Sequence, residues 1–226
     1  MPERHRGVRG RTVLVAGATS ASGHAAVAAL VAADARVIAL GRDEARLAPL
    51  RAVGARSATL DLADEAAVRG FAERMDAEGV RVDGVLHLVG GWRGGGGLAG
   101  QSDEDYRALE GGLTALRHVS RVFWNDLLAS PAARAAIVSS TAVARPLAGG
   151  ANYAAVKAAE EAWARAMAQG FAKDARDAGT PLRAASVIFR VKALAGLERE
   201  LADAFVELWD AEAHAINDTV VGLAAR

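Results

Sequence analysis

The chain has 226 residues, of which 52% are hydrophobic, and this supplies enough apolar side chains for the core of one domain. Lys and Arg number 27, as do Asp and Glu, so the net charge is zero and neither a nucleic acid nor an anionic membrane is expected as partner. The lack of cysteine excludes disulfides and thiolate metal sites. No stretch reaches membrane-spanning length, and residues 1–11 lack the apolar core of a signal peptide. We therefore expect a soluble, cytoplasmic protein with one domain over residues 1–226 and a flexible N-terminus at residues 1–10.

Short apolar runs alternate with longer amphipathic stretches along the chain. The expected strands are Thr12–Ala16, Arg36–Leu40, Arg56–Leu60, Gly84–Val89, Ala135–Ser139, Arg183–Phe189 and Thr219–Leu223. The expected helices lie near residues 23–33, 43–53, 64–78, 103–129, 151–178 and 197–213. Strands separated by helices predict a parallel sheet that is covered on both faces. Right-handed crossovers make this a doubly wound, Rossmann-like α/β sheet of about seven strands.

The first expected strand leads directly into a turn of small residues from Gly17 to Gly23. Glycine lets the backbone approach a pyrophosphate, which free N–H groups at the following helix N-terminus can hold. Ser20 and Ala21 occupy the positions where a dinucleotide-binding turn has its middle glycine. A tight turn without a ligand is therefore the alternative to nucleotide binding. Three hydroxyl groups in the turn could also donate to phosphate: Thr19, Ser20 and Ser22.

The ends of the second and third expected strands bear on cofactor choice. The second strand leads into Arg42 and has no acidic residue at its tip. An arginine pairs with the 2′-phosphate of NADP, whereas an acidic residue binds the 2′-hydroxyl of NAD. The sequence therefore favours NADP, unless Arg42 is only a solvated surface charge. After the third strand, Asp61 could reach an adenine amino group beside Leu62, or it could cap a helix.

Tyr153 and Lys157 lie four residues apart in a chain with two tyrosines and three lysines. On a helix this spacing places both side chains on one face. A neighbouring positive charge favours the phenolate and draws the tyrosine pKa toward neutrality, which makes tyrosine a usable general acid/base. Lysine suits this task because it is a compact donor that can also reach a ligand hydroxyl. The alternative is that the spacing arose by chance.

With these residues assembled, the chain resembles the short-chain dehydrogenase/reductase family along nearly its whole length. The family's glycine turn corresponds to Ala16–Gly23, with Ala21 in place of the middle glycine. Arg42 matches the family's NADP-selecting position and Asp61 its adenine contact. The family's Asn-Asn-Ala-Gly strand end corresponds to residues 87–90, so Gly90 is expected to line the cofactor site.

The catalytic residues implied by the resemblance are Ser140, Tyr153 and Lys157, since the family places its serine thirteen residues before the tyrosine. Tyr153 would protonate a carbonyl oxygen while NADPH delivers hydride, and the reverse reaction would oxidise an alcohol. Ser140 would donate a hydrogen bond to the reacting oxygen, although it could instead satisfy only backbone groups. Lys157 would bind the nicotinamide ribose hydroxyls. The implied substrate is a small carbonyl compound or alcohol.

The chain departs from the family pattern at several positions. Gly112 replaces the helix asparagine that anchors a water in the proton relay, and Phe189-Arg190 replaces a Pro-Gly pair. Two other functions therefore stay open: a non-redox isomerase, cyclase or dehydratase, and a non-catalytic subunit with weak or lost cofactor binding. The helices at 103–129 and 151–178 resemble the family's oligomer faces, so we expect a homo-dimer or homo-tetramer.

Several residues near the expected site have two interpretations. Trp92, Arg93 and Phe189 could line the substrate mouth or serve in packing and surface roles. The glycine-rich segment Gly90–Gly100 is either a loose surface loop or a mobile segment beside a ligand. His87 is expected to be a hydrogen-bonded structural residue. The histidines are scattered, so we expect no metal site.

Overall fold

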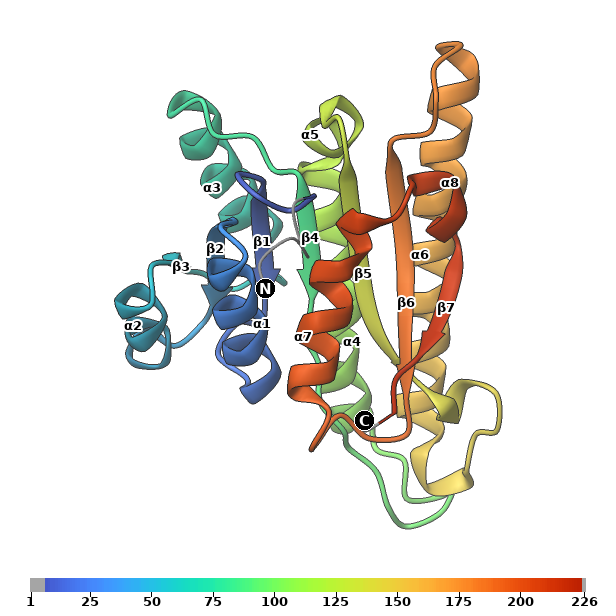
Figure 1. Ribbon diagram of the computed structural model, residues 1–226. Helices are drawn as coiled ribbons and strands as arrows, with labels where there is room; N and C mark the ends of the chain where they lie inside the picture. The colour runs from blue at the N-terminus through green and yellow to red at the C-terminus, as the bar shows by residue number, and fades with distance from the viewer. Residues whose placement is uncertain (1–6, 225–226) are drawn as a thin grey trace.

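The computed structural model describes residues 7–224, which form a seven-stranded parallel sheet with helices on both faces (Figure 1). The strands are β1 (Thr12–Ala16), β2 (Arg36–Gly41), β3 (Arg56–Thr59), β4 (Gly84–His87), β5 (Ala133–Ser140), β6 (Ala184–Val191) and β7 (Thr219–Gly222). Their order is β3-β2-β1-β4-β5-β6-β7. The predicted doubly wound fold is confirmed. The order reverses between β1 and β4, which is where such sheets bind ligands.

The helices pack in two layers. They are α1 (Ala21–Ala32), α2 (Glu44–Ala52), α3 (Glu65–Ala77), α4 (Asp103–Val122), α5 (Trp124–Ala129), α6 (Ala151–Asp177), α7 (Glu198–Glu207) and α8 (Ala213–Ile216). Helices α1 and α7 contact each other on one face of the sheet, while α3, α4 and α6 follow one another across the opposite face (Figure 1).

The alternation of side chains along β1 explains why both faces are covered. Val13 and Val15 are fully buried in the core under α1 and α7, whereas Leu14 and Ala16 are fully buried in the core under α3, α4 and α6. Because successive side chains of a strand point to opposite faces, a strand buried on both faces must be apolar throughout. This is why the strands could be recognised in the sequence as continuous apolar runs.

Polar side chains start four of the helices. Ser20, Asp43, Asp64 and Ser102 each stand at an N-cap, where the side-chain oxygen accepts a hydrogen bond from a backbone N–H of the first turn. These helices begin after loops that follow the carboxyl ends of strands. The caps therefore fix the loops from which the candidate site is built.

Two predicted helices are interrupted. The helix predicted over 103–129 breaks at Phe123, whose buried ring packs edge-on against Phe71 with 6.3 Å between ring centroids. The helix predicted over 197–213 tightens to a 3-10 turn at Leu208–Asp210. There the buried Trp209 donates a hydrogen bond of 2.8 Å to the Ala132 carbonyl. In both places the burial of an aromatic ring overrides helix periodicity.

The N-terminal segment falls partly outside the described residues. The flexibility expected for residues 1–10 concerns residues 1–6, which lie outside them, and residues 7–10, which lie within. Val8 is fully buried in the core beside α1 and α7, and the Gly10 amide donates to the Asp34 carbonyl. In the part of the chain that the structure describes, no helix is long and apolar enough to cross a membrane.

Candidate active site

The candidate site is a pair of adjoining cavities at the carboxyl ends of the central strands. The smaller cavity, of about 360 Å³, lies beside the first turn and the ends of β2 and β3. The larger, of about 970 Å³, lies beside the ends of β4, β5 and β6 and the start of α6. Four residues line both cavities: Ser20, Leu88, Val89 and Gly90. The two cavities therefore form one elongated site across the switch point of the sheet.

Glycines shape the first turn by close backbone approach. Gly17 has a φ of 83°, and a Cβ atom there would lie 2.8 Å from the backbone of Leu88. A Cβ atom on Gly23 would lie 2.4 Å from the Ala18 carbonyl oxygen. Both positions require glycine, the first for its left-handed conformation and the second for helix–turn contact. Close packing of the backbone therefore requires glycine at positions 17 and 23, whether or not a ligand is bound.

The hydroxyls of the turn have different surroundings. Ser20 accepts a hydrogen bond of 3.0 Å from the Gly23 amide and donates one of 3.1 Å to the Gly17 carbonyl. Its hydroxyl therefore caps α1. Thr19 lines the smaller cavity and Ser22 the larger one, and both remain candidates for phosphate contact. Ala21 is the first residue of α1, and it is exposed.

Two arginines line the smaller cavity. Arg42 is 79% exposed and its guanidinium lies 4.0 Å from the Asp61 carboxylate, while Arg46 reaches the same cavity from α2. Arg46 was not predicted, although its position one helical turn after Arg42 is a sequence signal. Asp61 accepts a hydrogen bond from the Ala63 amide. It does not cap α3, because Asp64 holds that position.

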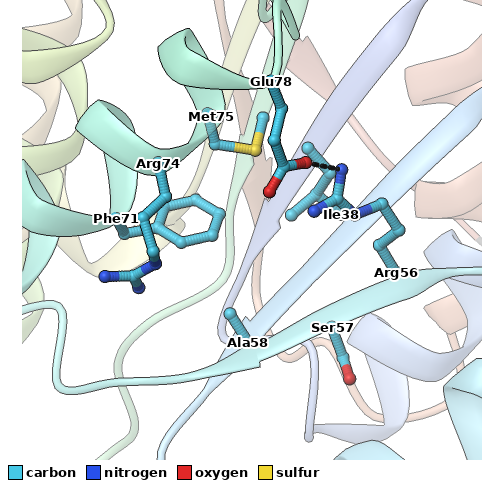
Figure 2. Close-up of a pocket in the computed structure, with 8 residues that line it drawn as sticks. All are labelled: Ile38, Arg56, Ser57, Ala58, Phe71, Arg74, Met75 and Glu78. Carbon is cyan, nitrogen blue, oxygen red and sulfur yellow. Dashed lines mark ion pairs between the residues drawn. The ribbon is translucent and has the colours of Figure 1, made fainter.

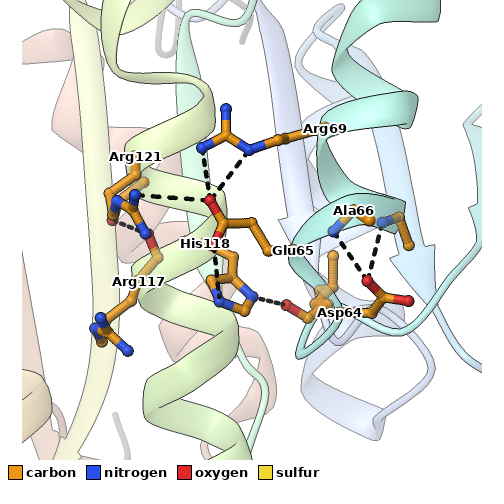
Figure 3. Close-up of polar contacts among 10 residues, drawn as sticks. Asp64, Glu65, Ala66, Arg69, Arg117, His118 and Arg121 are labelled. Carbon is orange, nitrogen blue, oxygen red and sulfur yellow. Dashed lines mark hydrogen bonds and ion pairs between the residues drawn. The ribbon is translucent and has the colours of Figure 1, made fainter.

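A polar network between α3 and α4 supports the loop that carries Leu62 (Figure 3). His118 Nδ1 lies 3.2 Å from the Leu62 carbonyl oxygen, and its Nε2 lies 3.9 Å from Glu65. Glu65 also pairs with Arg69 and, at 3.6 Å, with Arg121. The hydrogen bond from Arg69 lowers the pKa of Glu65. The network holds one wall of the smaller cavity, since Asp61 and Leu62 both line it.

Ser140, Tyr153 and Lys157 line the larger cavity together. Ser140 ends β5 and is 4% exposed, and its oxygen accepts a hydrogen bond of 3.1 Å from the Ala142 amide. Tyr153 and Lys157 lie in the first turns of α6. The Lys157 ammonium donates a hydrogen bond of 3.0 Å to the Val138 carbonyl. Gly90 faces it, since a Cβ atom there would lie 3.5 Å from Nζ.

Glu160 occupies the space that Gly112 leaves open. A Cβ atom on Gly112 would lie 3.1 Å from Glu160 Oε1, and Glu160 Oε2 accepts a hydrogen bond of 2.7 Å from Lys157. Burial raises the pKa of Glu160, and the contact with Lys157 opposes that effect. Glu160 was not predicted from the sequence. Its signal was a pair of adjacent glutamates in an alanine-rich helix, three and four residues after the lysine.

The second glutamate, Glu161, pairs with Arg190, which stands within β6 in the place of the family's Pro-Gly pair. Arg190 forms two hydrogen bonds with Glu161, of 3.1 and 2.6 Å, and Ser139 donates one of 2.6 Å to the same carboxylate. Phe189 is fully buried in the core, so of its two interpretations packing is confirmed and a place at the substrate mouth is not. Phe189 thus packs β6 into the core, and Arg190 binds β6 to α6 through Glu161.

His87 is not the hydrogen-bonded group that was expected. Its side chain is 2% exposed at the end of β4, and among the described residues neither ring nitrogen has a hydrogen-bond partner. Backbone groups of Gly112 and Val89 lie nearby without reaching hydrogen-bonding geometry. Burial and the Lys157 charge lower the pKa of His87 to about 3. The imidazole is therefore neutral at physiological pH.

The glycine-rich segment folds over the mouth of the larger cavity. The Gly95 amide donates to the Gly149 carbonyl at 2.7 Å, and the Gln101 side chain also donates to that carbonyl, at 3.1 Å. Trp92, which was expected at the mouth, lines the cavity and is 67% exposed. Arg93 is not among the lining residues and pairs with Asp105 at 3.2 Å.

A separate hollow of about 180 Å³ lies between α3 and the start of β3 (Figure 2). Arg56 and Glu78 form an ion pair of 2.7 Å in it, and the Arg74 guanidinium lies 5.8 Å from the Phe71 ring centre. It opens near the amino end of β3, whereas the candidate site lies at the carboxyl ends of the strands. Its charged side chains are already paired with one another.

The donor set fits a phosphorylated dinucleotide. The turn at Gly17 leaves backbone space that a Cβ atom would fill, and it leads into the N-terminus of α1. Arg42 and Arg46 both line the smaller cavity, where two guanidinium groups would pair with a 2′-phosphate. Fold and site thus define a nucleotide-binding α/β protein of the doubly wound class.

Comparison with known proteins gives the family. A family model described as short chain dehydrogenase matches residues 11–175, and the chain belongs to this family of oxidoreductases, which use nicotinamide cofactors. A protein from Streptomyces sp. (strain C5), named for daunorubicin C-13 ketoreduction, is 38% identical over 94 residues. That match covers 38% of this chain and only 33% of the relative, about a third of its length.

Solved structures agree with the fold. A short-chain dehydrogenase from Shigella flexneri, complexed with NADP, has a TM-score of 0.83 at 18% identity, covering 96% of this chain and 98% of that one. A gluconate 5-dehydrogenase from Burkholderia cenocepacia, in complex with NADP and tartrate, has a TM-score of 0.81 at 20% identity, covering 98% and 96%. At these identities the likeness is one of fold.

Proposed function

We propose that the protein is an NADP-dependent oxidoreductase that reduces a carbonyl compound, or oxidises the corresponding alcohol, with Tyr153 as general acid/base. The observation that carries the proposal is that Ser140, Tyr153 and Lys157 line a single cavity. That cavity continues past Gly90 into the one lined by the first turn and Arg42. The candidate proton donor thus lies in the same elongated site as the glycine turn.

The hydrogen bonds of the site suggest how each residue acts. The Ser140 oxygen accepts from Ala142, so its own proton is free to bond the reacting oxygen. An ammonium has three donors, of which Lys157 uses two, on Val138 and Glu160, and the third is available to a ribose hydroxyl. Tyr153 gives its proton to the carbonyl oxygen. Bound NADPH supplies the hydride.

The lining of the larger cavity supports a substrate with an extended apolar part. Trp92, Leu147 and Leu194 line it and give part of its wall an apolar surface. Arg145 and Lys192 add positive charge. We propose a carbonyl compound with a ring system or long apolar chain, and the daunorubicin C-13 ketone is one test substrate suggested by the Streptomyces relative.

The test has two stages. Titration of NADPH and NADH by fluorescence or calorimetry establishes cofactor binding, and a panel of ketones is then screened with the bound cofactor. Tyr153→Phe removes the proton donor with little change in volume, so it should lower turnover by about 10²-fold or more while sparing nucleotide affinity. Tyr106→Phe, at the exposed tyrosine of α4, is the matched control and should leave turnover unchanged. Full turnover in Tyr153→Phe would refute the catalytic assignment.

A non-redox activity in the same cavity is the second candidate, because Ala21 stands at the turn and Gly112 in α4. An isomerase, cyclase or dehydratase could use Tyr153 as acid/base without hydride transfer. The nucleotide titration separates the two functions. Saturable NADPH binding supports the oxidoreductase, whereas no saturation up to about millimolar nucleotide, a binding free energy weaker than about −4 kcal/mol, supports the non-redox alternative.

We also propose that the protein is a homo-dimer or homo-tetramer through the face of α4 and α6. A shallow hollow there is lined by Ser120, Arg121, Trp124, Trp163, Ala166 and Met167. Trp124 and Trp163 are half-buried there, and tryptophan is enriched at self-association surfaces. Light scattering after size exclusion gives the mass directly. Ala166→Arg, at an exposed position of this face, should yield the monomer.

A further inference from the structure

Gly112 and Glu160 form a complementary pair across the contact between α4 and α6. At Gly112 a Cβ atom would lie 3.0 Å from the Val89 carbonyl oxygen and 3.1 Å from Glu160 Oε1. Helix α4 therefore contributes backbone only at this point, and the carboxylate of Glu160 fills the room beside it. The Glu160 side chain of α6 therefore lies where a side chain at position 112 of α4 would lie.

The position of Glu160 is deeply buried and its charge has one partner of opposite sign. The side chain of Glu160 is 1% exposed and that of Lys157 is 11% exposed, with 2.7 Å between Oε2 and Nζ. Removing a charge from water is costly, so an ion pair at this depth is retained only where geometry compensates. Its partner is the same ammonium that borders the reaction cavity.

Among the described residues, the other ionisable groups around this pair give Glu160 no second partner of opposite charge. Tyr153 and Glu161 come from α6, His87 from β4 and Arg190 from β6. His87 is neutral above its pKa of about 3, and Glu161 is paired with Arg190 at 2.6 Å. Helix α4 brings only the backbone of Gly112. A change of charge at Glu160 therefore acts first on Lys157, which lines the same cavity as Tyr153.

We infer that Glu160 is a positioning residue of the reaction centre. From the space beside Gly112 it fixes the Lys157 ammonium against the cavity wall, and its negative charge limits how strongly that ammonium favours the Tyr153 phenolate. The inference rests on the proposed function, because it assigns Glu160 a part in the same proton transfer. A purely structural ion pair would hold the helix without any effect on the phenol.

The direct test is a spectroscopic titration that needs no cofactor. In a Tyr106→Phe background Tyr153 is the only tyrosine of the chain, and its phenolate absorbance can be followed against pH. Glu160→Gln removes the negative charge and keeps the size, so the phenolate should form at a lower pH than in the Tyr106→Phe protein. Glu161→Gln, the adjacent buried glutamate, is the matched control and should leave the midpoint in place. An unmoved midpoint in folded Glu160→Gln would overturn the inference.

A second test exchanges the two positions and covers the case in which Glu160→Gln folds poorly. Glu160→Ala should weaken NADPH binding by about fivefold, because Lys157 loses its anchor. Adding Gly112→Asn places an amide in the same space from α4 and should restore most of that affinity. Gly112→Asn alone should lower stability, since its Cβ would lie 3.0 Å from the Val89 carbonyl oxygen and 3.1 Å from Glu160 Oε1. Additive effects in this cycle would contradict the inference.

The two tests separate failure of this inference from failure of the proposed function. If no ketone is reduced but the phenolate midpoint moves in Glu160→Gln, the coupling of Glu160 to Tyr153 stands and the proposed reaction is wrong. If ketones are reduced and the midpoint does not move, the reaction stands and the role of Glu160 is wrong.

Discussion

The two halves of the site differ in how deeply their charged side chains are buried. We call the smaller cavity the cofactor half and the larger cavity the reaction half. In the cofactor half, Arg42 is 79% exposed and its contact with Asp61 is long, at 4.0 Å. In the reaction half, Lys157 and Glu160 are nearly buried and only 2.7 Å apart. Solvated charges interact weakly, whereas buried charges interact strongly and are costly to leave unpaired.

This difference predicts how each half tolerates change. In the cofactor half, a charge can be removed at little cost to folding, so ligand choice can be altered separately from stability. In the reaction half, each ionisable group is coupled to its neighbours and to the core. Substitutions there should change stability and chemistry together. Four substitutions, one on each of Lys157, His87, Arg42 and Ala21, test this contrast.

Lys157→Ala should have the largest effect on stability. It leaves the buried Glu160 without its partner, and breaking a buried pair costs about 3 kcal/mol or more of unfolding free energy. Chemical denaturation at neutral pH measures this loss. In the double variant Lys157→Met with Glu160→Gln both charges are gone, and most of the stability should return. A loss no greater than that of Arg42→Ala would remove the contrast between the two halves.

His87 gives the reaction half a distinct response to acid. The unfolded chain binds a proton at His87 below about its ordinary pKa of 6.5, whereas the folded protein binds it only near 3. Stability is therefore complete above 6.5 and is lost as the pH falls from 6.5 toward 3. Between pH 6.5 and 5 this loss should reach roughly 2 kcal/mol, at about 1.4 kcal/mol per unit.

Unfolding free energies of wild type and His87→Asn across that pH range isolate this contribution. The variant should lose less stability on acidification, because it has no imidazole to protonate on unfolding. His214→Asn, at an exposed histidine, is the matched control and should follow wild type. Parallel curves for wild type and His87→Asn would show that burial at the end of β4 does not suppress protonation.

Arg42→Ala should change ligand choice and leave stability unaffected. A charge-assisted hydrogen bond to a 2′-phosphate is worth about 1.5–3 kcal/mol, so NADPH should bind about tenfold or more tighter than NADH. Arg42→Ala should remove most of this difference in affinity between NADPH and NADH. Arg46→Ala should reduce the difference as well. Arg51→Ala, in the same helix but paired with Glu44, is the control and should keep the ratio. Equal affinities in wild type would refute the NADP assignment.

Local patterns in the sequence were sufficient for the fold and for part of the site. The strands are continuous apolar runs because they are buried on both faces, and the spacing of Tyr153 and Lys157 depends only on helix periodicity. Gly17 and Gly23 follow from the strand–turn–helix pattern, and the structure gives each a steric reason.

Residues whose setting depends on contacts between distant segments could not be predicted. Glu160 lies against Lys157 because α4 approaches α6 closely at Gly112, and that approach is a tertiary event. The missing partners of His87 and the burial of Phe189 have the same origin. Arg190 also reaches Glu161 only once α6 packs against β6. The sequence shows which residue types are present, but the residues that they contact depend on tertiary packing.

Ala21→Gly should have the smallest effect, and it tests whether the first turn still accepts a dinucleotide. Ala21 is exposed at the start of α1, while Gly17 and Gly23 already supply the close backbone approaches of the turn. The extra methyl group should therefore obstruct nucleotide little, and Ala21→Gly should leave NADPH affinity unchanged or improve it by no more than about tenfold. Glycine costs up to about 1 kcal/mol in a helix, and at this first position we expect less. Calorimetric titration of both proteins measures the change. A much larger gain would mean that the alanine blocks the pyrophosphate, and weak binding would then originate at the turn and not in the reaction half.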